Sequence, residues 1–103
     1  MFKITPKTTF TAAVALSVPG ESATARITVE FKHLAKSAIK EFFERLDGKT
    51  DAEALGEIVV GWEGVDTPYS QDALAALIDN YPASAGELFD TFRRELLEAR
   101  RKN

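Results

Sequence analysis

The sequence predicts an α+β domain in which an N-terminal antiparallel β-hairpin packs on about four α-helices. Apolar residues alternate with polar ones over the first third of the chain, and they recur every three or four residues after it. The 103 residues are enough for one core but not for two. We therefore expect a single domain over residues 1–103, with flexible ends at residues 1–8 and 99–103.

Two alternating runs, residues 9–18 and 25–32, predict the hairpin, with a turn beginning at Pro19-Gly20. The residues expected on its buried side are Phe10, Ala12, Val14, Leu16, Val18, Ala25, Ile27, Val29 and Phe31. A lone two-stranded ribbon is marginal in water, so its apolar face must pack on helices or its edge must find a partner. Residues 1–5 (MFKIT) could add a third strand.

A helical repeat begins after His33. Its apolar stripe comprises Ala35, Ala38, Ile39, Phe42, Phe43 and Leu46. Asp47-Gly48 is expected to end this helix, because glycine adopts the left-handed cap conformation without a Cβ penalty. Thr50 and Glu53 match a capping box, which predicts a second helix from there to about residue 60. That helix should bury Leu55, Ile58 and Val59.

Two further helices complete the predicted fold. Gly61 and Gly64 break the second helix, and Ser70 is the expected N-cap of a third. Pro82 ends the third helix and suits the first turn of a fourth. The residues expected to be buried are Leu74, Leu77, Ile78 and Tyr81 in the third helix, and Ala85, Leu88, Phe89, Phe92 and Leu96 in the fourth.

The net charge of −3 hides an uneven distribution along the chain. Residues 1–49 carry eight Lys and Arg against five Asp and Glu, whereas residues 50–92 carry nine acids and no Lys or Arg. Such a segment binds phosphates poorly, so we expect no nucleic-acid partner. The acids either cover solvated helix faces or form a surface that attracts a basic partner, and the basic C-terminal end could support self-association.

The composition also excludes several classes of protein. The chain has no Cys, which excludes disulfides, thiolate metal sites and a Cys nucleophile. No apolar run approaches the roughly 20 residues that span a bilayer, and the N-terminus lacks the apolar core of a secretory signal. We therefore expect a cytoplasmic protein without a membrane partner.

The residues that could carry chemistry match no catalytic, metal or cofactor motif. The only histidine, His33, has no acidic residue at ligand spacing nearby. The acids of residues 47–57 lack the spacing of a calcium loop, and Gly56, Gly61 and Gly64 lack the context of a dinucleotide motif. Gly56 instead indicates that another element packs closely on its helix. Because these motifs are missing, we expect no enzyme activity and no cofactor. An enzyme is a third alternative, which would need a polar pocket around His33 or the acidic segment.

Large apolar side chains are better candidates for partner binding. Trp62 and Tyr69 flank a glycine-containing turn, where they either plug the helix junction or act as exposed anchors. The stripe of Phe89, Phe92 and Leu96 belongs either to the core or to a groove or self-association face. All five are candidate partner-binding residues.

The segment of residues 58–82, IVVGWEGVDTPYSQDALAALIDNYP, is the most diagnostic part of the chain. Together with the hairpin, the Phe-rich helix and the basic ending RRELLEARRKN, it resembles the small tail assembly chaperones of long-tailed bacteriophages and prophages, the relatives of the lambda tail chaperone. The most specific motifs are GWEGVD at residues 61–66, Tyr69-Ser70 and Asn80-Tyr81-Pro82. The resemblance extends over nearly the whole chain.

This resemblance implies a non-catalytic chaperone that binds the tape measure protein, keeps it soluble and promotes tail tube assembly. The tail tube protein and a second copy of the chain are further partners that it implies. It also implies action in the bacterial cytoplasm and absence from the mature virion. Many such chaperones have a longer form made by ribosomal frameshifting, for which codons at Lys102-Asn103 would be the site. The alternative is a small structural tail component that stays in the virion.

Overall fold

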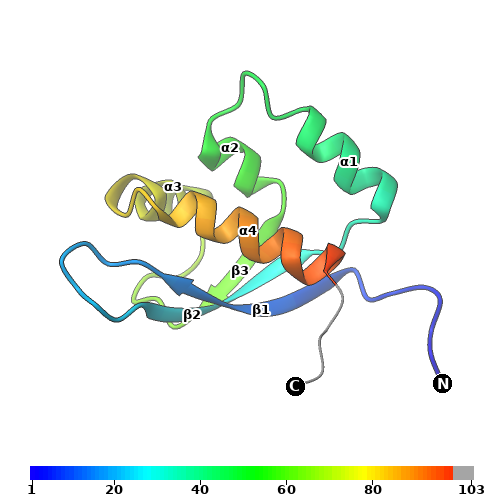
Figure 1. Ribbon diagram of the computed structural model, residues 1–103, viewed down its shortest axis with the longest axis horizontal. Helices are drawn as coiled ribbons and strands as arrows, with labels where there is room; N and C mark the ends of the chain where they lie inside the picture. Colours follow the sequence, from blue (N-terminus) through cyan, green and yellow to red (C-terminus); the bar gives the residue numbers. More distant parts are fainter. Residues whose placement is uncertain (99–103) are drawn as a thin grey trace.

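The computed structural model describes residues 1–98, which form a three-stranded antiparallel sheet with helices packed on one face (Figure 1). The elements in chain order are β1 (Thr9–Leu16), β2 (Ala25–Lys32), α1 (Lys36–Glu44), α2 (Asp51–Gly56), β3 (Val59–Glu63), α3 (Gln71–Asn80) and α4 (Ser84–Leu97). The predicted α+β class, with a hairpin and a third strand packed on helices, is confirmed. The flexible end expected at residues 99–103, and Lys102-Asn103 within it, lie outside the described residues.

The predicted hairpin is formed by β1 and β2, with Phe10 opposite Phe31 and Val14 opposite Ile27. Alternate residues of both strands are buried, as the period-two pattern predicts, although Ala25 at the start of β2 is exposed. The turn after β1 is closed by the Glu21 N–H, which donates to the Val18 carbonyl at 3.0 Å. In the sheet, β2 is the central strand, with β1 on one side and β3 on the other.

The third strand is not formed by residues 1–5, where it was expected. Residues 1–8 belong to no helix or strand, and β3 is instead Val59–Glu63, part of which was expected to be helical. α2 ends at Gly56 because the residues after it are Ile58, Val59 and Val60, whose β-branched side chains favour a strand. Ile58 and Val59 are buried as expected, but they are held there by the sheet, where the Ile58 carbonyl accepts from the Lys32 N–H at 2.7 Å.

A β-bulge between β2 and β3 sets the direction of the Trp62 side chain. Val59 lies opposite Phe31 and Trp62 opposite Val29, so the bulged strand carries one extra residue between these two pairs. Both Val59 and Trp62 consequently face the helices, while Val60 is 38% exposed. Without the bulge, strict alternation would turn Trp62 to the opposite face of the sheet.

The predicted helix caps are largely confirmed. The Thr50 hydroxyl accepts from the Glu53 N–H at 3.1 Å while the Glu53 carboxylate accepts from the Thr50 N–H, which completes the capping box at α2. The Ser70 hydroxyl caps α3 through the Ala73 N–H at 3.0 Å. Gly48 has the predicted left-handed conformation, with φ of +82°, but it lies in a turn beyond α1, which already ends at Glu44.

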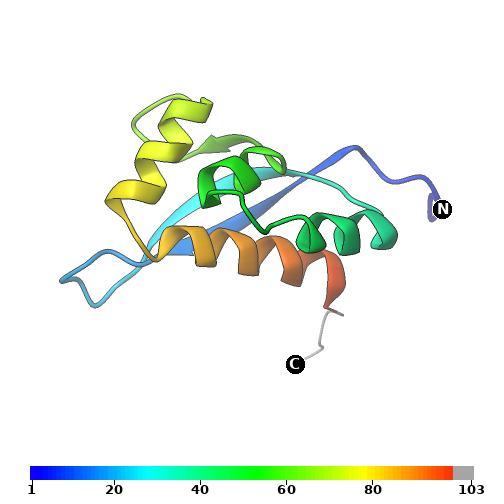
Figure 2. The ribbon, with the colours of Figure 1, turned by 90° about the horizontal axis from the view of Figure 1, so that it is seen from above.

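The helices cover one face of the sheet and leave the other open (Figure 1). Seen from the helix side, α3 and α4 diverge from a shared turn and α2 lies between them (Figure 2). The main core contains a phenylalanine cluster, defined here as Phe10, Phe31, Phe42 and Phe92. Its ring centroids lie 5.5 Å apart for Phe31 and Phe92 and 6.0 Å apart for Phe42 and Phe92.

Candidate functional site

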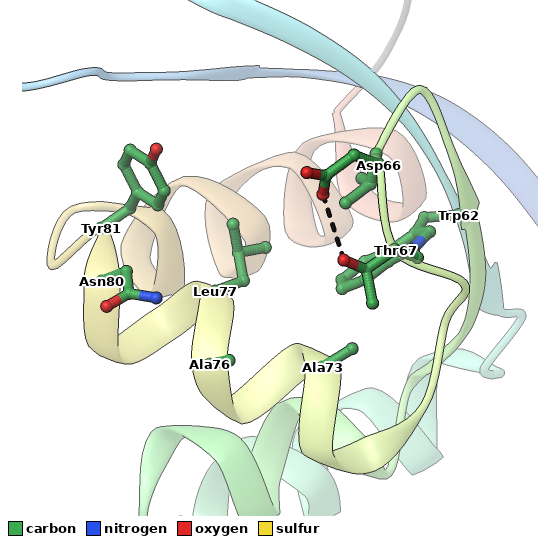
Figure 3. Close-up of a pocket in the computed structure, with 9 residues that line it drawn as sticks. Trp62, Asp66, Thr67, Ala73, Ala76, Leu77, Asn80 and Tyr81 are labelled. Carbon is green, nitrogen blue, oxygen red and sulfur yellow. Dashed lines mark hydrogen bonds between the residues drawn. The ribbon is translucent and has the colours of Figure 1, made fainter.

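An apolar hollow of about 190 Å³ lies between α3 and the loop that connects β3 to α3 (Figure 3). We call it the α3 groove. It is lined by Trp62, Val65, Asp66, Thr67, Ala73, Ala76, Leu77, Asn80 and Tyr81. Trp62 lies at one end, Asn80 and Tyr81 lie at the other, and Leu77 points into the space between them (Figure 3).

The polar atoms of Trp62 and Tyr69 hold the wall of the groove in place. Trp62 Nε1 donates to the Thr67 carbonyl at 2.8 Å, so the indole ties the loop back onto its own strand. The Tyr69 hydroxyl donates to the Val59 carbonyl at 3.0 Å, which ties the end of the loop to the start of β3. The two rings meet edge to face with centroids 5.1 Å apart. Burial raises the pKa of Tyr69 above its ordinary value.

The other wall of the groove is the exposed side of α3. Ala73, Ala76 and Asn80 recur at the spacing of one helix face, and the two alanines leave room above the helix surface. α3 itself is fixed by Gln71, whose Nε2 donates to the Gly56 carbonyl at 3.3 Å. The Gln71 side chain occupies the space that a Cβ at Gly56 would need, so the predicted close packing at this glycine is confirmed.

Three carboxylates surround this apolar surface. Asp66 lines the groove and accepts a hydrogen bond from the Thr67 hydroxyl at 3.1 Å. Asp72 and Asp79 are exposed on α3, at four residues before and three residues after Ala76. Residues three or four apart are neighbours on a helix surface, so Ala76 lies between these two acids. The groove therefore combines an apolar floor with an acidic rim.

The five predicted partner-binding residues do not form one surface. Trp62 lines the α3 groove, whereas Tyr69 is half-buried next to it. Phe92 is completely buried in the phenylalanine cluster, so its side chain has no surface to offer a partner in this conformation. Phe89 packs against Phe42 as a half-buried residue, and Leu96 lines a separate hollow between the start of α1 and the end of α4.

Of the nine residues that line the groove, only Trp62 was predicted to bind a partner. Tyr81, expected in the buried stripe, is 36% exposed because it lies at the C-cap, where α3 has ended. Leu77 is only half-buried because its side chain reaches both the core and the groove. Ala76 carried no signal of its own. Ala76 lines the groove only because the loop of residues 64–70 lies beside it in the folded chain.

The sequence singled out His33 and the acidic side chains as the residues that could carry chemistry. Within residues 1–98, no group of three or more His, Asp or Glu side chains lies where it could hold a metal ion. His33 is half-buried, with its ring edge-on to Phe10 at a centroid distance of 6.4 Å. In the same residues, no helix has both the length and the apolar character needed to cross a bilayer.

The comparisons with known proteins agree with the family resemblance that residues 58–82 indicate. A family model described as phage tail assembly chaperone matches residues 1–103, which is the whole chain. No similar curated protein and no similar solved structure was found. The match includes the residues that build the α3 groove as well as the hairpin and the Phe-rich helix. The chain therefore belongs to the family of phage tail assembly chaperones.

Proposed function

We propose that this chain is a non-catalytic chaperone that binds the tape measure protein, keeps it soluble and promotes assembly of the tail tube. Family membership provides the general role in tail assembly. The observation that supports client binding is the α3 groove, where Trp62, Leu77 and Tyr81 present apolar surface next to exposed acids. The place of action is the cytoplasm of the bacterial host, and the protein is absent from the finished virion.

The physical properties of the groove suit a chaperone that holds an aggregation-prone client. A partly exposed aromatic surface gains free energy by burying apolar side chains of the client. The surrounding carboxylates keep a complex charged and therefore soluble. Each groove is small, so tight binding to a long protein would come from many copies bound along it.

Further partners follow from the same role. A chaperone that brings tube subunits to the tape measure protein contacts the tail tube protein, and bound copies contact one another. Nucleic acid is a poor partner for this surface, because residues 50–92 contain nine acids and no Lys or Arg. Nothing in the proposed role requires a cofactor or a membrane.

The proposal is tested by expressing the tape measure protein with and without this chain and measuring how much of it stays soluble. A matched pair of variants locates the site. Ala76→Gln fills the α3 groove, whereas Ala13→Gln places the same side chain on the open face of β1. We expect soluble tape measure protein with the wild type and with Ala13→Gln, and a severalfold loss with Ala76→Gln.

Two results would contradict these assignments. If the tape measure protein is equally soluble without the chain, the proposed client is wrong. If Ala76→Gln protects it as well as Ala13→Gln does, the client binds elsewhere on the molecule. Mass spectrometry of purified virions addresses the alternative, a structural tail component, because only that protein would be found in the particles.

A further inference from the structure

We infer that the α3 groove selects a basic amphipathic helical segment, with one large apolar side chain flanked on both sides by Lys or Arg. This inference rests on the proposed function, since it describes the part of the client that the groove binds. It adds the chemistry of that segment, which neither the family nor the apolar surface alone specifies.

The size of the groove limits the apolar part of its ligand to one anchor. A closed cavity of about 150 Å³ holds one benzene molecule, so a groove of about 190 Å³ has room for one large aliphatic or aromatic side chain. The contact surface of α3 is also short. It covers the eight residues from Ala73 to Asn80, which are about 10 Å apart along the helix axis.

The charges around the groove specify what flanks the anchor. Asp72 and Asp79 lie on either side of Ala76, about two helical turns apart, and Asp66 lies on the opposite wall. Among the residues that the structure describes, none of these three carboxylates pairs with a Lys or Arg side chain. Their negative potential is therefore available to a ligand.

Charge complementarity then predicts the spacing of the ligand. A client helix that runs along α3 places its anchor opposite Ala76, in the space that the small side chain leaves. Lys or Arg residues one turn before and one turn after the anchor come opposite Asp72 and Asp79. Long basic side chains also cover apolar surface with their methylene groups, which suits the rim of a shallow groove. An acidic segment with the same anchor would be repelled.

The single Trp of the chain, Trp62, lines the groove and provides the measurement. Overlapping peptides of roughly 20 residues, about 30 Å long when helical, are made from the tape measure protein and titrated against the whole chain. Peptides that fill the groove change the Trp62 fluorescence. We expect the peptides that bind to carry a net positive charge and the basic–apolar–basic spacing. If the peptides that bind are acidic or uncharged, the inference is wrong.

A charge-neutralised variant tests the role of the rim directly. Asp72→Asn with Asp79→Asn should weaken binding of the best peptide roughly fivefold at low salt and reduce its salt dependence, as expected for exposed charge pairs. The control is Glu21→Gln with Glu41→Gln, which removes the same charge from exposed positions outside the groove. Equal affinities for the two double variants would overturn the inference.

The same experiment separates this inference from the proposed function. If no peptide and no intact tape measure protein binds the wild-type chain, the proposed function fails and the inference fails with it. If the tape measure protein binds but its affinity is the same for the wild type and for the Asp72/Asp79 variant, only the inference fails. Loss of binding on Lys→Gln substitution in the best peptide would support both.

Discussion

The molecule contains two groups of aromatic residues that are held in place by different forces. In the phenylalanine cluster, side chains from β1, β2, α1 and α4 meet through ring contacts, and Phe31 and Phe92 have no exposed surface. The Trp62–Tyr69 pair also makes a ring contact, but each of its residues donates a hydrogen bond to a backbone carbonyl. Three rings of the first group are buried and that of Phe10 is half-buried, whereas Trp62 of the second group lines the α3 groove.

This difference shows how a small domain can carry a binding surface without losing its core. An aromatic ring held only by packing must be surrounded, because its stabilisation comes from the apolar area that it buries. A ring with a polar atom can be fixed by that atom and leave part of its apolar face exposed. The pair therefore suits recognition, and the cluster suits stability. Three substitutions test this division, beginning with the one of largest expected effect.

Phe92→Ala should destabilise the fold by about 3–5 kcal/mol, because it removes a completely buried ring that contacts three other phenylalanines. Domains of this size are typically stable by about 5–15 kcal/mol, so the variant should be close to unfolding. Urea unfolding followed by circular dichroism gives the free energy. Phe89→Ala is the matched control, since Phe89 is only half-buried on the same helix and should lose less. Similar losses for both would show that the cluster is not the main support of the core.

Tyr69→Phe should have a smaller effect of about 1–2 kcal/mol, because the buried Val59 carbonyl loses its donor while the ring remains. Hydrogen exchange should also become faster in residues 61–69, where the loop is tied to β3. Tyr81→Phe provides the control, since the Tyr81 hydroxyl makes no hydrogen bond within residues 1–98. If Tyr69→Phe leaves both stability and exchange unchanged, packing rather than hydrogen bonding holds the loop.

The two groups of aromatic residues also differ in how much of their placement could be predicted from the sequence. The hairpin and the phenylalanine stripe follow from local periodicity, because the residues that share a face are two, three or four positions apart. The caps at Thr50 and Ser70 are also local, and both are confirmed. The core position of Phe31 follows from such a local pattern, whereas the stripe of Phe92 left the core and a partner-binding face both open.

The α3 groove depends on contacts that no single segment contains. The start of β3 was predicted as helix because the capping box begins a helical pattern that Ile58 and Val59 can continue. Its pairing with β2, and the bulge that turns Trp62 toward the helices, require a partner strand about 30 residues earlier in the chain. Once β3 is placed, the loop to Ser70 must fold back over α3. The signal that could have identified the strand was the run of residues 58–62 (IVVGW), which follows Gly56 closely and is rich in β-branched and aromatic residues.

A third substitution tests whether polar contacts also secure the segment that leads into β3. The Glu57 carboxylate pairs with Lys49 and, at 3.5 Å, with Arg45. The hydrogen bond from Lys49 is the main cause that holds the pKa of Glu57 below its ordinary value of 4.5. The Glu57 side chain is 36% exposed, so Glu57→Gln should lose only about 0.2–1 kcal/mol at neutral pH.

The pH dependence of this loss distinguishes it from the effect of Phe92→Ala. A carboxyl whose pKa is lowered on folding stabilises the protein above its unfolded-state pKa, and this contribution disappears as the pH falls through the folded-state pKa. Wild type and Glu57→Gln should therefore differ at neutral pH and become equal in acid, whereas the loss from Phe92→Ala should persist at both, because no charge is involved. Glu63→Gln, at an exposed site without an ion pair in residues 1–98, is the control for a lost charge. A difference between wild type and Glu57→Gln that does not change with pH would mean that the ion pairs contribute nothing, and that hydrogen bonds and packing alone fix β3 beneath the α3 groove.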